Sequence, residues 1–446
     1  MSIFRSYDIR GIFGKDLTPK IAELIGKAFG TYFGGNATVV VGRDMRDSGK
    51  ILKERFIKGL MSTGCDVVDI GMVPTPVVYF SINSLKADGG AVVTASHNPP
   101  EWNGFKLRRE KAFGLYYEEG LKKVEEVFNT REFETGKGKL EKVDMTEDYV
   151  ESMSKKLKIE RDIKVVVDVG NGMGGISKRI LENLGIETLT LFEEPDGRFP
   201  NHLPDPFKEE NLRFLQKHIV KEKADLGIAF DGDCDRAGFV DEKGRIVPTD
   251  YSMLVYLRHM INEDNKKVVV DIRCPSITVE SMKKIGFEVF VTRVGNPYLM
   301  EKLHQVDGIF AGEVSGHFWF KKWYGFDDGI FAGMFMVEIA SKENSLSTLI
   351  DSMPKRFFIP DRRVECPDEK KQKVMEALKL RLKRDYSDAE IIEIDGVKII
   401  TDEWSVLVRP SNTQPMITLT VDSKSNNVEE IYARFEKVVK EIISSV

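Results

Sequence analysis

The sequence predicts an α/β protein in which three repeated mixed α/β sheet domains and a C-terminal α+β domain surround a central cleft. A chain of 446 residues is too long for one ordinary hydrophobic core. One pattern of strands and helices occurs three times, and a different pattern follows from about Pro360. We therefore expect four domains, at residues 1–145, 146–247, 248–357 and 358–446.

The repeated unit opens on a β-branched run, which is typical of a parallel strand buried on both faces. The three runs are TVVVGRD from Thr38, KVVVDVGNG from Lys164 and KVVVDIRCP from Lys267. An amphipathic helical stretch follows each run and stops at a glycine, which suits a left-handed helix end. These glycines are Gly64, Gly185 and Gly286.

A second strand and then a third complete each unit. The second strands are CDVVDIG, IETLTLF and FEVFVTR, and the third lie in ADGGAVVTASHNP, ADLGIAFDGDCDR and VDGIFAGEVSGH. Any α/β protein repeats such patterns to some degree, but here every third strand ends in a polar loop with reactive side chains. Because ligands of open α/β sheets bind beyond the carboxyl ends of the strands, the three loops are expected to border one cleft.

The C-terminal part has a different order of elements. A strand near residues 362–366 precedes a Lys/Glu-rich helix and two strand runs, AEIIEIDGVKIIT and WSVLVRPSNTQPMITLTVDS. A final helix is predicted by an apolar stripe at Val428, Ile431, Tyr432, Phe435, Val438, Val439 and Ile442. The polar stretch at residues 134–158 is expected to join the first and second units.

The composition of the chain limits which binding partners and which cellular compartment we expect. Net charge is −5 and no long charged run occurs, so neither a nucleic acid nor a membrane is expected as the main partner. Four widely spaced cysteines favour free thiols in a reducing compartment. The opening MSIFRSYDIRG lacks a signal peptide's apolar run, and the apolar stretch at residues 329–340 is too short to cross a bilayer. These features predict a cytoplasmic protein.

The loop DGDCDR predicts a metal site. Asp231, Asp233 and Asp235 alternate, so in an extended segment their carboxylates face one way and can share a hard cation, Mg²⁺ rather than zinc. An EF-hand is one alternative, since Glu242 is the twelfth residue of such a loop. Its sixth position, however, is Arg236 where glycine is needed, and the preceding segment is a predicted strand. A solvated acidic turn is the other alternative.

The loop TASHNP places Ser96 and His97 directly after a buried strand. Alone, Ser96 is an ordinary turn residue, and adjacent Ser and His side chains diverge. With a metal loop at the equivalent place in the next unit, Ser96 becomes a candidate phosphoryl acceptor. Lys106 in EWNGFK is a candidate acid/base or phosphate partner, or else a solvated surface lysine. Arg236 is placed to neutralise a phosphorylated Ser96.

The loop GEVSGH offers Glu313 and Ser315 to sugar hydroxyls and His317 for proton transfer, although a polar turn is an alternative interpretation. RPSNTQP in the last domain combines an arginine with hydroxyl and amide donors, which suits a phosphate, or else a simple β-turn. Its residues are Arg409, Ser411, Asn412 and Thr413. Arg10 in YDIRG is ambiguous alone.

At these residues the sequence resembles the α-D-phosphohexomutase family. YDIRG, TASHNP, DGDCDR, GEVSGH and RPSNTQP occur in that family's order, and five motifs in order are highly specific. The resemblance covers essentially the whole chain and is strongest to the phosphomannomutase/phosphoglucomutase branch. It implies four domains around a cleft, with one loop from each.

The resemblance also implies a reaction. Family members carry the loop serine as phosphoserine and bind Mg²⁺ through the three aspartates and that phosphate. The phosphoserine gives its phosphoryl group to glucose or mannose 1-phosphate. The resulting glucose or mannose 1,6-bisphosphate, which is both intermediate and activator, turns over in the cleft before the serine recovers the other phosphate.

Carried to this sequence, the resemblance assigns each motif residue a role. The catalytic candidates are Ser96, Lys106, His317, Arg10 and His97. The substrate-binding candidates are Tyr7, Arg236, Arg273, Glu313, Ser315, His317, Arg409, Ser411, Asn412 and Thr413. The metal candidates are Asp231, Asp233, Asp235 and the phosphate on Ser96.

Three positions bear on the choice of sugar. Asn296 stands where the bifunctional enzymes tend to have His, and Arg273 stands where family members tend to have Lys. SNT in the last loop is more similar to the mannose/glucose branch than to phosphoglucosamine mutases, which tend to carry SGT. A phosphoglucosamine mutase is therefore the nearest alternative, and a metal- or sugar-binding protein without turnover is the alternative of another class.

Overall fold

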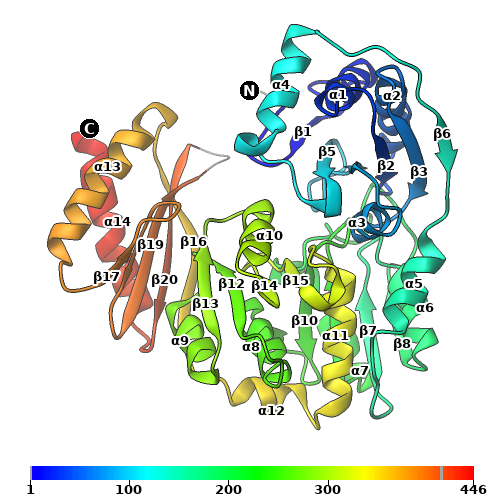
Figure 1. Cartoon of the computed structure of the whole chain (residues 1–446). Helices are drawn as coiled ribbons and strands as arrows, with labels where there is room; N and C mark the ends of the chain where they lie inside the picture. Colours follow the sequence, from blue (N-terminus) through cyan, green and yellow to red (C-terminus); the bar gives the residue numbers. More distant parts are fainter. Residues whose placement is uncertain (1–2, 412–414) are drawn as a thin grey trace. The chain divides into compact units, whose positions relative to one another are not determined.

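The computed structural model describes residues 3–411 and 415–446, and these residues form two compact units. The first unit is the chain up to Ser252 together with Ser315–Asp351. The second is Met253–Val314 together with Ser352–Val446. Figure 1 labels the helices and strands of both units.

The first sheet has six strands in the order β1-β5-β4-β2-β3-β6. Its repeated part is parallel, with β2 between β3 and β4, while β1 and β5 are antiparallel to their neighbours. The strands are β1 (Ile9–Ile12), β2 (Thr38–Arg43), β3 (Asp66–Met72), β4 (Gly89–Val93), β5 (Trp102–Arg109) and β6 (Leu140–Lys142). The helices are α1 (Pro19–Tyr32), α2 (Gly49–Met61), α3 (Thr75–Ser84) and α4 (Leu121–Thr130).

The second sheet has the order β11-β10-β9-β7-β8, with β7 parallel to both β8 and β9. Its strands are β7 (Lys164–Asp168), β8 (Glu187–Leu191), β9 (Leu226–Phe230), β10 (Ala237–Asp241) and β11 (Ile246–Val247). The helices near it in sequence are α5 (Thr146–Ser154), α6 (Ile176–Asn183) and α7 (Glu209–Glu222). The stretch expected to be a connector thus contributes β6 and α5, and α5 buries Tyr149 and Met153.

The third repeat lies in the second unit, where β12 is parallel to both β13 and β14. The strands are β12 (Lys267–Asp271), β13 (Glu288–Thr292) and β14 (Phe310–Gly312), with helices α9 (Ser276–Ile285) and α10 (Asn296–Gln305). The helix α8 (Thr249–His259) precedes them. In all three repeats the first strand therefore lies between the second and the third, which confirms the repeated unit.

The C-terminal domain is a five-stranded antiparallel sheet in the order β16-β20-β19-β18-β17, covered by two helices. Its elements are β16 (Phe357–Glu365), α13 (Asp368–Asp385), β17 (Glu390–Ile392), β18 (Val397–Ile400), β19 (Trp404–Pro410), β20 (Met416–Ser423) and α14 (Val428–Ser445). Six of the seven predicted stripe residues of α14 are buried, and Val438 is partly buried. The fold class is confirmed: mixed α/β sheets in four domains.

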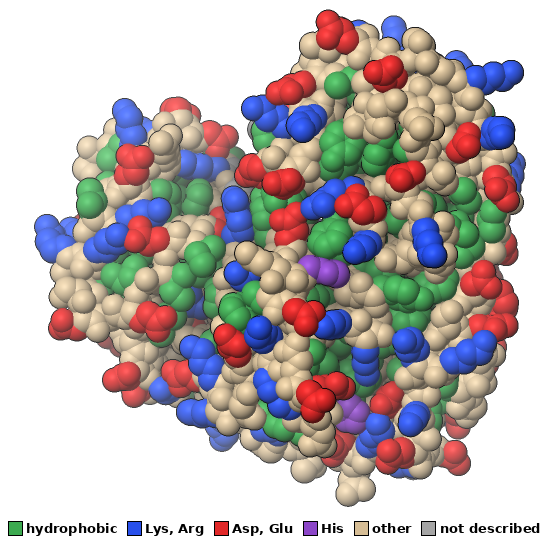
Figure 2. All heavy atoms as spheres, viewed as in Figure 1, with side chains coloured by type: hydrophobic (Ala, Val, Ile, Leu, Met, Phe, Trp, Pro, Cys, Tyr) green, Lys and Arg blue, Asp and Glu red, His purple; other side chains and the backbone are tan. Residues whose placement is uncertain are grey.

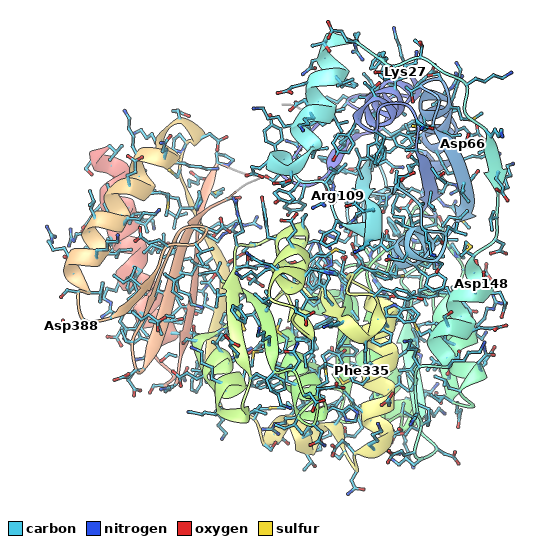
Figure 3. The ribbon with its side chains drawn as sticks, in the orientation of Figure 1. Lys27, Asp66, Arg109, Asp148, Phe335 and Asp388 are labelled. Carbon is cyan, nitrogen blue, oxygen red and sulfur yellow. The ribbon has the colours of Figure 1, made fainter. Side chains whose placement is uncertain are left out.

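The apolar stretch at residues 329–340 forms a helix buried on every side, α11 (Gly329–Lys342). Figure 3 labels Phe335 on this helix, and its ring packs against Phe320 of β15 (Phe318–Phe320) at 5.4 Å. Trp323 stacks on Phe331 at 5.1 Å. The hydrophobicity of this stretch therefore serves the core of the first unit.

The surface agrees with the mixed composition. Figure 2 shows Lys and Arg side chains interspersed with Asp and Glu over the visible face. Within residues 3–411 and 415–446, none of the helices combines the length and the apolar character that a bilayer crossing requires. The four cysteines, all described, are buried and form no disulfide.

Candidate functional site

The serine loop connects β4 to β5 in the first unit and places Ser96 at the carboxyl end of β4. Ser96 is 2% exposed and has a left-handed backbone, with φ of 51°. This conformation is unfavourable for a residue with a side chain and is typical of functional sites in which the surroundings enforce it. Lys106 is carried by β5, next to Val92 of β4, so its side chain returns to the same end of the sheet.

The aspartate loop is the tight connection of the antiparallel pair β9 and β10. The prediction of an extended segment was wrong, because residues 231–236 form turns and Cys234 has a φ of 64°. The carboxylates of Asp231, Asp233 and Asp235 nevertheless converge, each with an oxygen within 4.8 Å of the others. The preceding element is strand β9, as expected in the argument against an EF-hand. All three side chains are at most 1% exposed, so a solvated turn is excluded.

The two loops meet through direct hydrogen bonds. Ser96 Oγ donates to Asp231 Oδ2 over 2.6 Å, and Lys106 Nζ donates to Asp233 Oδ2 over 2.6 Å and also to Asp235. Thr75 Oγ1 donates to Asp233 Oδ2 over 2.5 Å at the start of α3. Lys106 is only 9% exposed, so the interpretation as a solvated surface lysine is wrong.

These contacts and the burial of the site shift the pKa values of its charged side chains. Burial and the charges of Asp235 and Asp233 raise the pKa of Asp231 well above its ordinary value. Burial alone would lower the pKa of Lys106, but Asp233 and Asp235 raise it well above the ordinary value, so Lys106 carries a positive charge. Burial would likewise raise the pKa of Asp235, but the positive charges of Lys106 and Arg236 lower it, and Asp235 is ionised.

The aspartate cluster fits a hard divalent cation. Asp233 Oδ1 and Asp235 Oδ1 are buried, and neither accepts a hydrogen bond from the described residues. A buried carboxylate oxygen without a donor is costly unless a cation neutralises it. Oxygen donors alone are the ligand set of Mg²⁺ rather than of zinc. Asp231, Asp233 and Asp235, with Ser96 beside them, would hold such an ion.

His317 is held from both ring nitrogens. Arg236 Nε lies 2.9 Å from His317 Nε2, and because a guanidinium only donates, Nε2 accepts. The proton of the neutral ring is then on Nδ1, which lies 3.1 Å from the carbonyl oxygen of Asp235 and 3.1 Å from Asp327 Oδ2. The ring therefore presents a basic Nε2 beside the aspartate loop.

His97 and Arg10 are also brought to the serine loop. His97 Nδ1 lies 3.1 Å from Ser96 Oγ, although adjacent side chains were expected to diverge. The left-handed Ser96 backbone allows the approach. Burial, together with Arg236 and Arg10, lowers the pKa of His97 well below its ordinary value, so the ring is neutral. Arg10 Nη1 donates to Asn98 Oδ1 over 2.8 Å, and Tyr7 lies just before β1, 38% exposed.

The remaining predicted residues fall in two groups. Ser315 lies in the first unit, two residues before His317. In the second unit Arg273 forms an ion pair with Glu313 over 3.2 Å. Arg409 Nη2 lies 3.0 Å from Asp395 Oδ2 in the same unit, and the backbone N–H of Ser411 donates to the Met416 carbonyl over 2.9 Å. Asn412 and Thr413 lie outside the described residues.

Several buried residues around the site escaped the sequence reasoning. Asp44 and Arg46 follow β2 directly, so their position at a strand's carboxyl end was an available signal. Thr94 begins the serine loop itself. Asp327, which holds His317, comes from FDDG, a segment with no distinguishing pattern.

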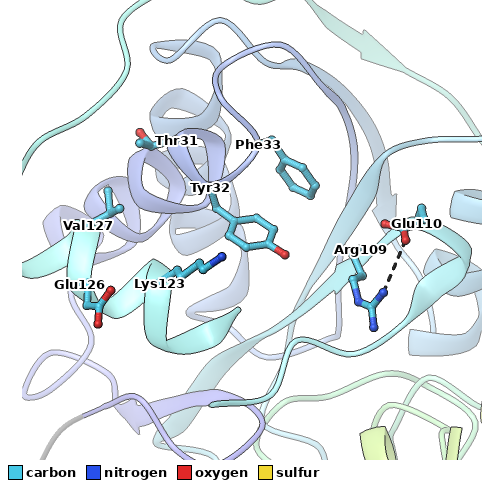
Figure 4. Close-up of a pocket in the computed structure, with 8 residues that line it drawn as sticks. All are labelled: Thr31, Tyr32, Phe33, Arg109, Glu110, Lys123, Glu126 and Val127. Atoms are coloured by element: carbon cyan, nitrogen blue, oxygen red, sulfur yellow. Dashed lines mark ion pairs between the residues drawn. The ribbon is translucent and has the colours of Figure 1, made fainter. Parts of the chain in front are cut away.

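The pocket of Figure 4 is separate from this site. It has a volume of about 800 Å³ and lies between the end of α1, the end of β5 and α4. Its lining residues are Thr31, Tyr32, Phe33, Arg109, Glu110, Lys123, Glu126 and Val127. Arg109 shares its face of β5 with Phe105 and Leu107 of the core, whereas Lys106 points to the other face. The catalytic candidates therefore do not line this pocket.

A histidine outside the cluster gives the first unit a pH-dependent contact. His202 Nε2 lies 3.1 Å from Asp168 Oδ1 at the end of β7, and its Nδ1 lies 2.9 Å from the Leu203 carbonyl oxygen. Two acceptors favour the doubly protonated ring. Burial alone would lower the pKa of His202, but the hydrogen bond to Asp168 and its charge raise it above the ordinary value.

Because the folded-state pKa of His202 is raised, its stabilisation is complete below the unfolded-state value and is lost as pH rises through the folded-state value. We expect the thermal midpoint to decline as pH rises above the ordinary histidine pKa of about 6.5. His202→Gln should flatten part of that decline, as followed by differential scanning fluorimetry. His218→Gln is the matched control, because His218 is a half-buried residue of α7 whose Nδ1 lies 2.8 Å from the Phe214 carbonyl oxygen and which pairs with no carboxylate in the described residues. Superimposable pH profiles of wild type and His202→Gln would contradict the assignment.

The comparisons with known proteins agree with this geometry. Models of the phosphoglucomutase/phosphomannomutase family match the chain in order: alpha/beta/alpha domain I over residues 1–135, domain II over 147–244, domain III over 248–357 and the C-terminal domain over 363–438. The chain therefore belongs to the phosphoglucomutase/phosphomannomutase family, a family of mutases that act on phosphosugars.

The chain is also similar over its full length to individual members of this family. It is 37% identical over 432 residues to the phosphomannomutase/phosphoglucomutase of Pseudomonas putida, covering 95% of this chain and 92% of that protein. It is 35% identical to a probable phosphoglucosamine mutase of Thermococcus kodakarensis, covering 99% of each. A crystal structure of a phosphoglucomutase/phosphomannomutase family protein from Burkholderia thailandensis superposes with a TM-score of 0.92 at 35% identity, covering 99% of this chain and 97% of that one.

Proposed function

We propose that this mutase interconverts the 1-phosphates and 6-phosphates of mannose and glucose through a phosphorylated Ser96 and a 1,6-bisphosphosugar. The observation that carries the proposal is the contact between Ser96 and the aspartate loop, with Ser96 Oγ 2.6 Å from Asp231 and Lys106 bound to the other two carboxylates. Phosphoryl transfer depends on such positioning and charge neutralisation more than on covalent chemistry.

In the first transfer the bond between phosphorus and Ser96 Oγ breaks while a bond from phosphorus to a sugar hydroxyl oxygen forms. The hydroxyl proton goes to a base, and Ser96 Oγ receives a proton from an acid. In the second transfer the bond from phosphorus to the other sugar oxygen breaks while the bond from phosphorus to Ser96 Oγ forms again, with the proton movements reversed. A 1,6-bisphosphosugar phosphorylates Ser96 before the first turnover. At the end of each turnover the bisphosphosugar intermediate gives a phosphoryl group back to Ser96. A Mg²⁺ ion held by Asp231, Asp233 and Asp235 would neutralise charge on the phosphoryl oxygens.

Lys106 and His317 are the proposed acid and base. Lys106 is cationic because two carboxylates surround its ammonium, so it has a proton to give. His317 presents Nε2 without a proton, in contact with Arg236 Nε at 2.9 Å. A phosphate dianion would attract Arg236 and leave this nitrogen available to the sugar hydroxyl. His97 within the serine loop and Arg10 bound to Asn98 of that loop are proposed to assist there.

Sugar and phosphate recognition are assigned to the remaining residues. Arg273 holds Glu313, whose carboxylate is 4% exposed, and this fixes an acceptor for sugar hydroxyls. Arg409 Nε is buried without a hydrogen-bond acceptor among the described residues, which supports a role in binding the non-reacting phosphate. We also assign a role in substrate binding to Tyr7, Arg236, Ser315, Ser411, Asn412 and Thr413.

The domain limits and the compartment are part of the proposal. We divide the chain at residues 1–145, 146–247, 248–357 and 358–446, so that each domain contributes one of the loops TASHNP, DGDCDR, GEVSGH and RPSNTQP. Four cysteines without a disulfide suit a reducing compartment, and we place the enzyme in the cytoplasm.

A substrate panel tests the choice of sugar. Isomerisation of the 1-phosphates of glucose, mannose and glucosamine is followed side by side with Mg²⁺ and the matching 1,6-bisphosphate. We expect kcat/KM for glucose and mannose to exceed that for glucosamine at least about tenfold. A preference for glucosamine phosphate would overturn the assignment in favour of a phosphoglucosamine mutase, the name of one 35% identical relative.

A further inference from the structure

Ser96 is surrounded by a buried polar assembly that none of the proposed catalytic steps uses. It comes from the segment that follows β2 and consists of Asp44 and Arg46, both 0% exposed. An arginine completely removed from solvent is unusual unless its guanidinium is fully engaged. The hydrogen-bond partners of Arg46 therefore indicate its role.

The guanidinium of Arg46 donates to four backbone carbonyls of the serine loop. Nη2 donates to Ser96 O over 2.8 Å and to Asn98 O over 2.5 Å. Nη1 donates to Pro99 O over 2.7 Å and to Trp102 O over 3.0 Å. The segment from Ser96 to the start of β5 thus surrounds the Arg46 side chain. The guanidinium satisfies backbone carbonyls that have no helix or sheet partner there.

Asp44 fixes the other peptide group of Ser96, the one that carries its N–H. Its Oδ2 accepts from Thr94 Oγ1 over 2.7 Å, and Thr94 Oγ1 in turn accepts from the backbone N–H of Ser96 over 2.9 Å. Asp44 also forms an ion pair with Arg46 Nε over 3.3 Å. The N–H and the C=O of Ser96 are therefore both bound, one through Thr94 and one through Arg46.

The assembly is enclosed on its outer side. The Phe199 ring covers the guanidinium, with its centroid 5.2 Å from Arg46 Cζ. A β-carbon at Gly197 would come within 2.8 Å of Arg46 Cα, and one at Gly232 would come within 2.6 Å of the Ser96 carbonyl oxygen. The serine loop therefore has little room to relax if its internal contacts are lost.

We propose that Arg46, together with Asp44, is a positioning residue that holds the Ser96 backbone in its left-handed conformation and so aims Oγ at the aspartate loop. The proposal rests on the proposed role of Ser96 as phosphoryl carrier. A left-handed serine relaxes to an ordinary conformation unless both of its peptide groups are bound. Such a relaxation turns Oγ away from Asp231, while the sugar and distal phosphate sites are unaffected.

Arg46→Lys is the first test, because a lysine ammonium has three donors and no plane with which to span four carbonyls. We expect kcat to fall about 100-fold, since a displacement of about 1 Å at the reacting centre costs that much, with KM changed less than about threefold. Arg198→Lys, in the exposed part of the loop that covers Arg46, is the matched control and should retain wild-type kinetics. A fall in kcat smaller than about tenfold in folded Arg46→Lys would overturn the proposal.

Thr94→Val and Thr94→Ser give a second pair in case Arg46→Lys does not fold. Valine removes the acceptor for the Ser96 N–H at nearly constant volume, and serine keeps it. We expect kcat to fall at least about tenfold in Thr94→Val and to stay within about threefold of wild type in Thr94→Ser. Equal activities of the two variants would overturn the proposal.

Hydrogen exchange at the Ser96 amide tests the same contact without turnover. We expect exchange to accelerate at least about tenfold in Thr94→Val and not in Thr94→Ser, because only valine leaves the N–H without its partner. Unchanged protection in Thr94→Val would overturn the positioning role. An inactive wild-type enzyme with this exchange pattern would instead overturn the proposed function and leave the contact established.

Discussion

Replacing Ser96 with alanine is expected to abolish mutase turnover, with a loss in kcat of at least about 10⁴-fold. The physical reason is that Ser96 Oγ is the group proposed to carry the phosphoryl, and no second hydroxyl among the described residues donates to Asp231 in its place. Coupled assays of glucose 6-phosphate formation measure the loss. Intact mass spectrometry measures the phosphate on wild-type protein incubated with 1,6-bisphosphate, which Ser96→Ala should lack.

Ser81→Ala is the matched control, because Ser81 is also buried in the first unit but only donates to the Val77 carbonyl within α3. It should retain both turnover and the phosphate. Substantial activity in Ser96→Ala, or a phosphate that persists in it, would contradict the carrier assignment.

Asp233→Ala is expected to lower kcat by about 100-fold or more and to remove the stabilisation that Mg²⁺ gives the wild type. Asp233 contributes the buried Oδ1 that has no hydrogen-bond donor among the described residues, and its removal leaves two carboxylates for the cation. The fold should persist, because Lys106 keeps its ion pair with Asp235. Thermal midpoints with and without Mg²⁺ measure the effect.

Asp196→Ala is the control for Asp233→Ala, because Asp196 pairs with the exposed Arg198 away from the aspartate cluster. Its Mg²⁺-dependent shift should equal that of the wild type. Retention of both activity and the Mg²⁺ shift in Asp233→Ala would count against the metal site.

The strands, their succession along the chain in each repeat and the loops at their ends could be predicted because they depend on local patterns. The order of the strands in each sheet was not predicted. Buried parallel strands show β-branched runs, and the connection rules of α/β sheets place the loops of successive units at equivalent ends. TASHNP and DGDCDR were recognised in this way. Their residues Ser96 and Asp231 form a hydrogen bond across 135 positions of the chain.

What could not be predicted depends on tertiary contacts. Lys106 has the same sequence environment as a surface lysine, and only the return of β5 beside β4 buries it against the aspartates. The turns of the aspartate loop and the left-handed backbone of Ser96 arise from packing, since nothing in their local sequence requires them. Arg46 satisfies carbonyls more than fifty positions away, a partnership that no local pattern encodes.

The ion pairs of Lys106 have a consequence for how the enzyme is assembled in the cell. A cluster of three buried carboxylates would by itself oppose chain collapse, because each carboxylate loses hydration while repelling the others. The ammonium of Lys106 acts as a built-in counterion for two of them, and the Ser96 hydroxyl binds the third. The three carboxylates therefore have partners within the chain itself, and we expect the fold to form without a cation in the cluster.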